Sequence, residues 1–331
     1  MSYAINRRSA LLLGTAAVGA LAATALPVFA QEKAKLRFSA VFSEQDIRAE
    51  MMKMFGAAIA QDFAFEGYYG GNLFKQGTEL VALQRGNLEM GNIAPQDFSK
   101  QIPAWSILTA AYLFRDAAHM QKFFASDMGA QMKKMTEDQL QVKVLGPTYF
   151  GARQIGLKPN KKITTPADMA GIKLRMPPGE TWQFLGESLG ANPTAMAYAE
   201  VYTGLQTGSI DGQDNPLPNV ENMKFYEVMS QIVLTSHLVG FDLPTVSSKT
   251  WGAMSADQQK RFQAAADAAI DFSTKKHLAR EKELVDLFKS KGLAIYEPDQ
   301  AAFRKYAQAK YLASELAKSW PPGMVEKINA L

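Results

Sequence analysis

Apolar and polar positions follow two periods along the chain, and their order predicts an α/β protein. Short apolar runs typical of strands occupy residues 36–42, 63–69 and 88–93. Residues 45–61 and 78–85, which lie between these runs, place apolar side chains at helical spacing. A strand-helix-strand-helix-strand order indicates a parallel sheet covered by helices.

The rest of the chain continues this alternation and predicts a second α/β unit. The pattern changes at residues 149–155, where we place the first crossing between two domains. The other expected elements are strands at 142–147, 172–176, 231–235, 243–247 and 293–296, and helices at 118–125, 129–139, 180–189, 199–206 and 299–318.

One helix is expected to be much longer than the others. Ser255 and Gln258 form a capping-box pattern, and neither glycine nor proline interrupts the helical spacing up to about Lys289. A helix that spans two domains restricts their relative motion to a hinge. We therefore assign residues 31–150 and about 241–280 to domain I, residues 151–240 and about 281–331 to domain II, and the helix at 256–289 to both.

The N-terminal segment has the features of an export signal. Arg7 and Arg8 precede an apolar, alanine-rich run at 10–26, and small residues follow it, so we expect cleavage after about Ala30. The arginine pair also resembles a twin-arginine signal. The alternative is an uncleaved anchor, because the apolar run approaches the length of a membrane span. Cleavage would place the mature protein in the periplasm.

Length and charge limit the class of protein. A chain of 331 residues exceeds one ordinary core, which favours two domains. Without Arg7 and Arg8, Lys+Arg falls from 36 to 34 against 32 acidic residues, a net charge of +2. No basic patch indicates a nucleic-acid partner.

Cysteine and histidine usage argues against metal and thiol chemistry. The chain has no cysteine, which excludes disulfides, thiolate metal sites and cysteine nucleophiles. The three histidines, His119, His237 and His277, are far apart in sequence and form no H-E-x-x-H motif. We expect no metal and no cofactor. His119 and His277 fall in helical patterns, and we expect both to face solvent.

The candidate site lies in the stretch 171–219. Arg175 ends the strand at 172–176, and Asn215 follows Asp211-Gly212-Gln213-Asp214. Open α/β sheets present such strand-end groups to a ligand. A guanidinium matches a carboxylate with two parallel hydrogen bonds, so the stretch predicts a receptor for an acid. The alternatives are a surface ion pair for Arg175 and a turn role for Asn215 before Pro216.

Several motifs together resemble a known family. They are Thr165-Pro166-Ala167-Asp168-Met169-Ala170-Gly171-Ile172-Lys173-Leu174-Arg175, Gly190-Ala191-Asn192-Pro193-Thr194, Glu200-Val201-Tyr202 and Leu205-Gln206-Thr207-Gly208-Ser209-Ile210-Asp211-Gly212-Gln213-Asp214-Asn215-Pro216. This combination resembles the solute-binding subunits of tripartite ATP-independent periplasmic (TRAP) transporters, in the dicarboxylate-receptor family. The similarity covers nearly all of the mature chain. It implies a periplasmic binding protein fold, with two α/β domains, a ligand cleft between them and a long helix across the hinge.

The resemblance also implies roles for individual residues. Arg175 matches the family arginine that grips the ligand carboxylate, and Arg153 matches a second arginine near the same group. Asn215 matches the amide that completes the clamp, Tyr198 falls where the family has an aromatic wall, and His237 falls on a position that can line the pocket. The alternatives are a salt bridge between domains for Arg153 and a core position for Tyr198.

The facing wall is expected to come from the first domain. Lys75, Gln76, Asn92 and Gln96 are polar groups that could meet hydroxyls or a second carboxylate. A glutamate that some relatives use near Ala94 is missing. This absence argues against a ligand like sialic acid and favours a smaller or differently shaped acid.

We therefore predict a monomeric, hinge-closing receptor that delivers a small organic acid to the small and large membrane subunits of a TRAP permease. A sugar acid such as an aldonate or uronate is the first choice of ligand. The alternatives are a C4-dicarboxylate, an aromatic or branched hydroxy acid with Trp182 and Tyr198 as walls, and a receptor that feeds a sensor kinase. The chain has no G-x-S-x-G motif and no histidine–carboxylate arrangement, so we do not expect an enzyme.

Overall fold

A computed structural model of the chain describes residues 33–331, and the predicted signal segment and its cleavage site lie outside them. The strands of the described part are β1 (Ala34–Ser39), β2 (Phe63–Tyr68), β3 (Met90–Ile93), β4 (Val142–Val144), β5 (Thr148–Leu157), β6 (Lys173–Met176), β7 (Asn192–Ala195), β8 (Gly212–Pro216), β9 (Gln231–Ser247) and β10 (Ala294–Tyr296). The α-helices are α1 (Ile47–Ala58), α2 (Glu79–Gln84), α3 (Pro95–Ser99), α4 (Ala117–Ala125), α5 (Asp127–Leu140), α6 (Glu180–Ser188), α7 (Val201–Thr207), α8 (Leu217–Asn222), α9 (Ser248–Gly252), α10 (Ala256–Ser290), α11 (Gln300–Leu312) and α12 (Met324–Asn329). Short 3-10 helices occupy Pro103–Thr109, Pro166–Met169, Tyr198–Glu200, Phe225–Glu227 and Leu316–Ser319.

The strands form one continuous hydrogen-bonded order, β2-β1-β3-β9-β5-β8-β6-β7, with β4 and β10 also paired to β9. Pairing is parallel from β1 to β2 and β3, and again from β6 to β7 and β8. We call the part built on β1–β4 the first lobe and the part built on β6–β8 and β10 the second lobe. Each lobe contains a small group of parallel strands, as the alternation of elements predicts, and the first lobe adds antiparallel pairs of β3 and β4 with β9.

Two long strands and one long helix connect the lobes. The far end of β9 pairs with β3 and β4, whereas its first part pairs with β5 and β10. The sequence predicted two separate strands here, but the intervening residues continue as one strand of 17 residues. Its residues are almost all buried, so the polar alternation that would reveal a single strand is missing.

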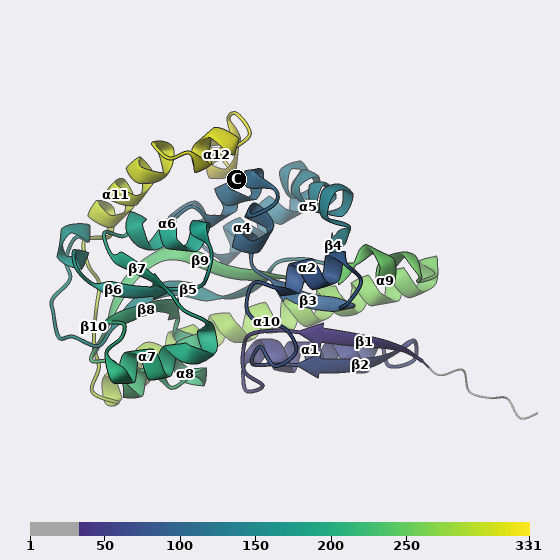
Figure 1. Cartoon of the computed structure of the whole chain (residues 1–331), viewed down its shortest axis with the longest axis horizontal. Helices are drawn as coiled ribbons and strands as arrows, with labels where there is room; N and C mark the ends of the chain where they lie inside the picture. The colour runs from purple at the N-terminus through teal and green to yellow at the C-terminus, as the bar shows by residue number, and fades with distance from the viewer. Residues whose placement is uncertain (1–32) are drawn as a thin grey trace, which may run out of the picture. The chain divides into compact units, whose positions relative to one another are not determined.

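The helix α10 has 35 residues and begins with the predicted capping box of Ser255 and Gln258. It packs against α1 of the first lobe, against β5, and against α8 and β10 of the second lobe. Figure 1 shows α10 running along both lobes. The exact domain boundaries drawn from the sequence remain a prediction.

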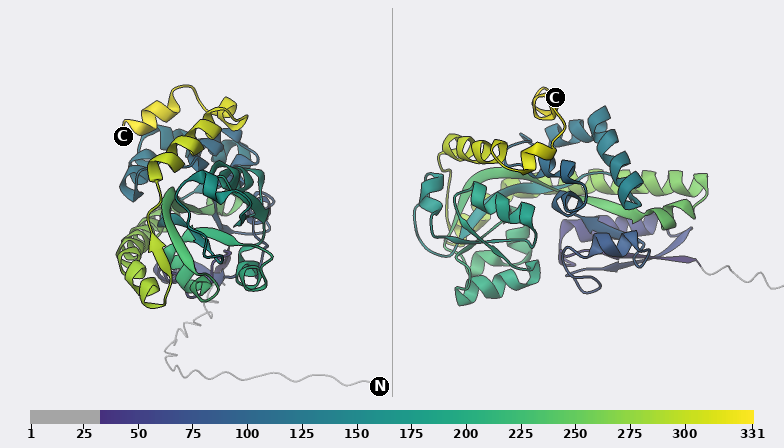
Figure 2. Two further views of the ribbon diagram at one scale, coloured as in Figure 1. Left: turned by 90° about the vertical axis from the view of Figure 1, so that its left-hand side faces the viewer. Right: turned by 45° about the horizontal axis from the view of Figure 1, so that its top comes forward.

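The C-terminal helices return across the second lobe to the first. The helix α11 packs on α6 and β9. The last residue of the chain, Leu331, accepts from Lys122 of α4 through its carbonyl oxygen, and Figure 2 marks this C-terminus in both views. His119 on α4 accepts from Arg115 N through Nδ1 at 3.1 Å, and its Nε2 lies 2.7 Å from Ile328 O. The expectation that His119 faces solvent is wrong, because the returning chain covers it.

His277, in the middle of α10, is also fully buried, contrary to expectation. Its Nδ1 lies 2.8 Å from Ser273 O, and burial lowers the pKa of the ring to about 4. A helix that contacts both lobes has more than one buried face, and the sequence pattern alone did not reveal this.

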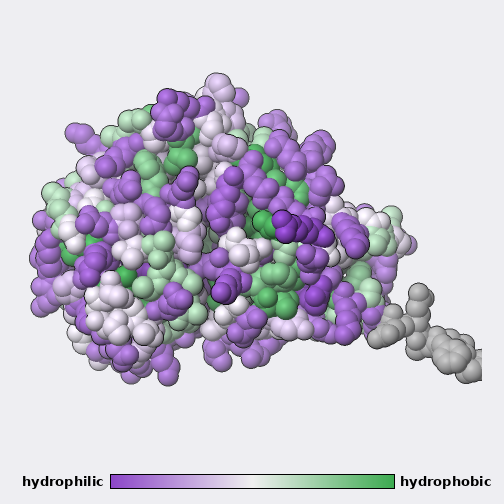
Figure 3. Space-filling view, viewed as in Figure 1, coloured by the Kyte–Doolittle hydropathy of each residue, from purple (hydrophilic) through white to green (hydrophobic). Residues whose placement is uncertain are grey.

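The surface in Figure 3 is mainly hydrophilic, with apolar residues in small patches. Within residues 33–331, no helix combines the length and apolarity needed to cross a bilayer.

Candidate functional site

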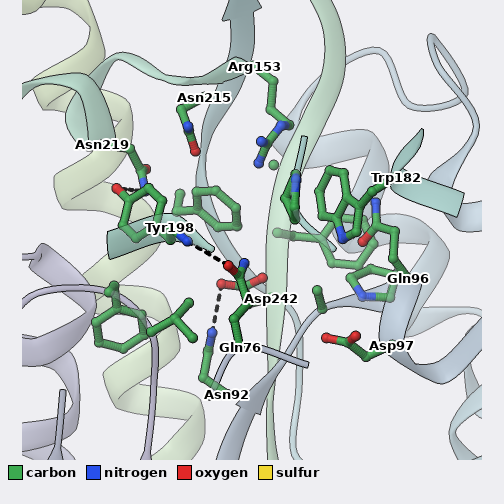
Figure 4. Close-up of a pocket in the computed structure, with 18 of the residues that line it drawn as sticks. Gln76, Asn92, Gln96, Asp97, Arg153, Trp182, Tyr198, Asn215, Asn219 and Asp242 are labelled. Atoms are coloured by element: carbon green, nitrogen blue, oxygen red, sulfur yellow. Dashed lines mark hydrogen bonds between the residues drawn. The ribbon is translucent and has the colours of Figure 1, made fainter. Parts of the chain in front are cut away.

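A cavity lined by both polar and apolar side chains lies between the two lobes, and residues from both lobes line it. About 820 Å³ of space is free of atoms there, part of it open to solvent. In Figure 4, Arg153 and Asn215 lie at the top, Asn92 and Asp97 lie at the bottom, and Gln96 lies beside Trp182 at the right. Strands β5 and β8 supply Arg153 and Asn215, and β3 and α3 supply Asn92, Gln96 and Asp97.

Arg175, on β6, is the central cation of the cavity. It is 0% exposed, yet it forms no salt bridge with any carboxylate of the described chain. Its Nε donates to Met196 O at 2.9 Å, and its Nη2 lies 3.4 Å from Gln76 Oε1. Burial lowers the pKa of Arg175 to about 10, so the group is still charged at neutral pH. A buried cation without a counter-ion costs several kcal/mol, which a bound anion offsets.

Arg153, on β5, is held by Asp214 of the neighbouring strand β8. Its Nε donates to Asp214 Oδ2 at 2.9 Å and its Nη2 donates to Oδ1 at 2.7 Å, while Trp182 lies 4.8 Å from the guanidinium carbon. Its Nη1 has no hydrogen-bond partner within residues 33–331. Arg153 therefore does form a salt bridge, but it joins the connecting strand β5 to the neighbouring strand β8 and not one lobe to the other, and Arg153 also lines the cavity.

His237 lies behind this pair. Its Nε2 is 2.9 Å from Asp214 Oδ2 and its Nδ1 is 2.8 Å from Thr235 Oγ1. Burial lowers the pKa of His237. Burial alone would raise the pKa of Asp214, but Arg153 and His237 outweigh it and hold that pKa far below its usual range. His237 is fully buried and is not among the described residues that line the cavity, unlike the position implied by the resemblance.

Asn215 and Tyr198 do line the cavity. Asn215 lies in β8 and donates to Gln213 Oε1 at 2.6 Å. The Tyr198 hydroxyl accepts from Asn219 Nδ2 at 3.0 Å, and its ring centre is 5.8 Å from the guanidinium carbon of Arg175. The structure thus brings both predicted arginines, the predicted amide and the predicted aromatic residue to one wall.

The facing wall contains most of the residues expected from the first domain. Gln76 Oε1 accepts from Tyr198 N at 2.8 Å and approaches Arg175, so this side chain reaches across the cavity. Asn92 Nδ2 donates to Asp242 Oδ2 at 2.7 Å, and Gln96 also lines the cavity. Lys75 is exposed and does not line it.

A third arginine of the cavity, Arg48 on α1, was missed from the sequence. Its Nε and Nη2 bond to Asp46 at 3.0 and 2.8 Å, and its Nη1 bonds to Asp242 at 2.6 Å. The guanidinium lies between the rings of Phe42 and Phe150, at 4.4 and 4.3 Å. All three nitrogens are occupied, so Arg48 is a structural cation. Asp242 is 194 positions away, and no sequence spacing reveals that contact.

Two carboxylates on the first-lobe side were also missed. Glu79, on α2, is 3% exposed and accepts from Gly77 N at 2.8 Å, and it has no cation partner within residues 33–331. Burial raises its pKa to about 8. Asp97, on α3, pairs with Lys100 at 2.6 Å, and burial still raises its pKa.

Three amide oxygens of the cavity accept no hydrogen bond within the described chain. They are Asn92 Oδ1, Gln96 Oε1 and Asn219 Oδ1. Buried acceptors of this kind each cost about 1–3 kcal/mol unless a donor reaches them. The cavity can therefore take up an anion on its arginine side and hydrogen-bond donors, water included, elsewhere.

Two α/β lobes, the strands and helix that connect them, and a cavity between the lobes are the arrangement of a protein that encloses a small solute. A family model for bacterial extracellular solute-binding proteins, family 7, matches residues 38–317. The chain belongs to that family, whose members are receptors and not enzymes. The predicted resemblance, fold class and absence of an enzymatic role are confirmed.

Similar proteins include TRAP periplasmic receptors of known structure. One from Roseobacter denitrificans with bound 3-deoxy-D-manno-oct-2-ulosonic acid is 44% identical, has a TM-score of 0.89, and is matched over 90% of this chain and 99% of its own. Another from the same species, with bound L-galactonate, is 28% identical with a TM-score of 0.82, over 90% and 99%. The sialic acid-binding periplasmic protein of Vibrio cholerae is 32% identical over 71% of this chain and 74% of its own.

Proposed function

We propose that the protein is an extracytoplasmic receptor for a sugar acid, with the ligand carboxylate held by Arg175 and Arg153 and by the amide of Asn215. The observation that carries this proposal is the fully buried guanidinium of Arg175, which has no carboxylate partner within residues 33–331. A carboxylate there would receive charge-assisted hydrogen bonds, each contributing about 1.5–3 kcal/mol.

Hydroxyl groups are the donors that suit the rest of the cavity. The unpaired oxygens of Asn92, Gln96 and Asn219 each accept from a hydroxyl, and a sugar acid carries several. The relatives with bound 3-deoxy-D-manno-oct-2-ulosonic acid and L-galactonate support this ligand class. The first of these is a larger acid than the sequence favoured, so ulosonic acids belong beside aldonates and uronates as candidates.

A C4-dicarboxylate suits the cavity less well. Its second carboxylate would meet Asp97 and Asp242, and the cations beside those two acids, Lys100 and Arg48, are already paired with them. An aromatic acid gains little from Trp182, whose ring already packs on Arg153.

The route of delivery is also a proposal. The exported chain, cut after about Ala30, would bind the acid in the periplasm as a monomer and close about the connections β5, β9 and α10. Closure is stabilised because only the closed form lets both lobes contact the ligand. The closed receptor would then pass the acid to the small and large membrane subunits of a TRAP permease.

A thermal-shift screen of the chain from Gln31 tests the proposal. The panel contains aldonates, uronates, ulosonates, C4-dicarboxylates, aromatic hydroxy acids and the neutral sugars that match the acids. A ligand at 100 times its dissociation constant should stabilise the protein by about 2.7 kcal/mol, an easily measured rise in Tm. We expect sugar acids to produce the shift and neutral sugars to produce none. Shifts only from neutral sugars, or only from C4-dicarboxylates, would overturn the proposal.

A further inference from the structure

One side chain of the first lobe reaches the cavity arginine of the second. Gln76 lies in a tight turn between β2 and α2, in which Thr78 N donates to Lys75 O at 3.0 Å. Gly77, the third residue of the turn, has a φ of +83°, the backbone angle that a type II turn requires there. Glu79 supports the turn, because its Oε2 accepts from Gly77 N at 2.8 Å. The turn therefore holds Gln76 at the edge of the cavity, which its side chain lines.

The contacts of Gln76 determine which way its amide faces. Its Oε1 accepts from Tyr198 N at 2.8 Å and lies 3.4 Å from Arg175 Nη2, and a dashed line in Figure 4 marks the first of these contacts. Both neighbouring groups can only donate, so the branch of the amide that faces them is the oxygen. The NH2 group is the other branch, and it donates to no atom within residues 33–331.

This NH2 group is close to the place proposed for the ligand carboxylate. Gln76 Nε2 is bonded to the same carbon as Oε1, so it lies within about 6 Å of Arg175 Nη2. Arg175 Nη1 likewise has no hydrogen-bond partner in the described part of the chain. A ligand oxygen that accepts from Arg175 at about 3 Å can thus also accept from Gln76.

We propose, resting on the sugar-acid function above, that Gln76 is the first-lobe residue that binds the acid end of the ligand, by donating from Nε2 to an oxygen of the carboxylate or of the hydroxyl beside it. The contact needs both lobes, because Tyr198 and Arg175 of the second lobe orient an amide that belongs to the first. Recognition of the acid end is thereby shared between the lobes. A neutral ligand end gains less from Gln76, because a hydrogen bond to a charged acceptor is the stronger one.

Titration calorimetry on the chain from Gln31 tests this inference, with L-galactonate, D-glucuronate and 3-deoxy-D-manno-oct-2-ulosonate as probes. Gln76→Met keeps the length of the side chain but removes the amide. It should lower the affinity for each acid that binds the wild type by roughly 30-fold, the loss expected for a hydrogen bond to a charged group. An unchanged affinity would overturn the inference while leaving the sugar-acid function intact. Binding of no sugar acid to the wild type would overturn the function itself.

A second variant separates donation to the ligand from contact between the lobes. Gln76→Glu keeps an oxygen for Tyr198 N, but it replaces the NH2 donor with a carboxylate oxygen next to the acid end of the ligand. It should lower the affinity by about 100-fold or more, because a donor is lost and two like charges are brought together. Binding of the acids at wild-type affinity by Gln76→Glu would overturn the inference.

Two controls complete the series. Ser99 Oγ lies 2.8 Å from Thr181 Oγ1 of the other lobe, and neither side chain is among the described residues that line the cavity. Ser99→Ala should therefore lower the affinity by only about 3-fold, the effect of one neutral hydrogen bond. Gln131→Glu makes the same charge change at an exposed position of α5 and should leave the affinity unchanged. A loss in Ser99→Ala as large as that in Gln76→Met would assign Gln76 to lobe contact alone and overturn the inference.

Discussion

Two fully or nearly buried arginines in one cavity have different roles, and their hydrogen bonds distinguish them. Arg48 uses all three nitrogens on Asp46 and Asp242. Arg175 uses one nitrogen on a backbone carbonyl and has only a long contact to Gln76. The first arginine balances buried acids of the protein, whereas the second is available for an external anion.

This difference predicts opposite effects of truncation. Arg175→Ala should abolish measurable binding of the acid but leave the melting temperature of the ligand-free protein unchanged or raised, because it removes an uncompensated buried charge. Arg48→Ala should lower the free energy of unfolding by about 3–5 kcal/mol, because Asp46 and Asp242 lose their counter-ion. Calorimetric melts and ligand titrations of both variants provide the measurement. A large loss of stability in Arg175→Ala would contradict the assigned role.

Glu79 predicts a pH effect of defined sign. Its pKa is raised by burial from 4.5 to about 8, so the folded protein holds this proton more tightly than the unfolded chain does. The resulting contribution to stability is fully present below pH 4.5 and is lost as pH rises through about 8. The Glu79→Gln variant cannot ionise at this position and does not lose this stability. The difference in free energy of unfolding, variant minus wild type, should therefore increase by on the order of 2 kcal/mol between pH 5 and pH 8.5. Chemical denaturation of wild type and variant at pH 5 and pH 8.5 measures this difference. A difference that is the same at both pH values would contradict the prediction.

At the residue scale, the sequence located one wall better than the other. Arg175, Arg153, Asn215 and Tyr198 follow from a specific family pattern, and the structure brings them together. The sequence did not identify Arg48, Glu79 and Asn219 as cavity residues. Their role depends on contacts in the folded cavity with residues that are far away in sequence. His237 belongs to the same network through Asp214, but behind the cavity surface.

At the element scale, β5 aims Arg153 by means of two irregularities. The pairing of β5 with β9 shifts between Tyr149 and Gly151 and again between Arg153 and Ile155. Such bulges reorient side chains next to functional sites. Glu281 of α10 stabilises the irregularity between Tyr149 and Gly151, because its Oε1 accepts from Ala152 N at 2.7 Å. The long helix thus helps to position a cavity arginine.

Gly151 is the residue on which this arrangement depends. Its φ is +124°, and a Cβ there would lie 2.5 Å from Pro216 Cβ and 2.9 Å from Glu281 Oε1. Gly151→Ala should lower stability by several kcal/mol and weaken ligand binding, because the bulge must move. Gly171→Ala is the control, since its φ is +80° but nothing lies within 4 Å, and it should cost only about 1–2 kcal/mol. Similar losses of stability in the two variants would contradict this account.

The elements with clear periodicity were predictable, and those without it were not. The helix α10 was recognised from its capping box and its uninterrupted spacing. The strands β5 and β8 are buried on both faces, so they show no alternation, and β9 was divided in two for the same reason.

At the scale of the whole molecule, the two lobes line one cavity and also contact each other beside it. Ser99 Oγ of the first lobe and Thr181 Oγ1 of the second lie 2.8 Å apart, and Gln76 bonds across to Tyr198 N. These contacts join the walls beside the cavity. Length and the long helix predicted two domains that share a hinge, and the family resemblance implied the cleft between them. Which side chains meet across the cleft depends on three-dimensional packing that one sequence does not reveal.

The most direct test of the central claim is a crystal structure of the chain from Gln31 with the sugar acid that gives the largest thermal shift. The account predicts a carboxylate within about 3 Å of the Arg175 guanidinium, a common hydrogen-bond distance. It also predicts ligand hydroxyls against Asn92 and Gln96. A ligand whose carboxylate faces the first-lobe side or solvent, with Arg175 bonded only to protein atoms, would contradict it.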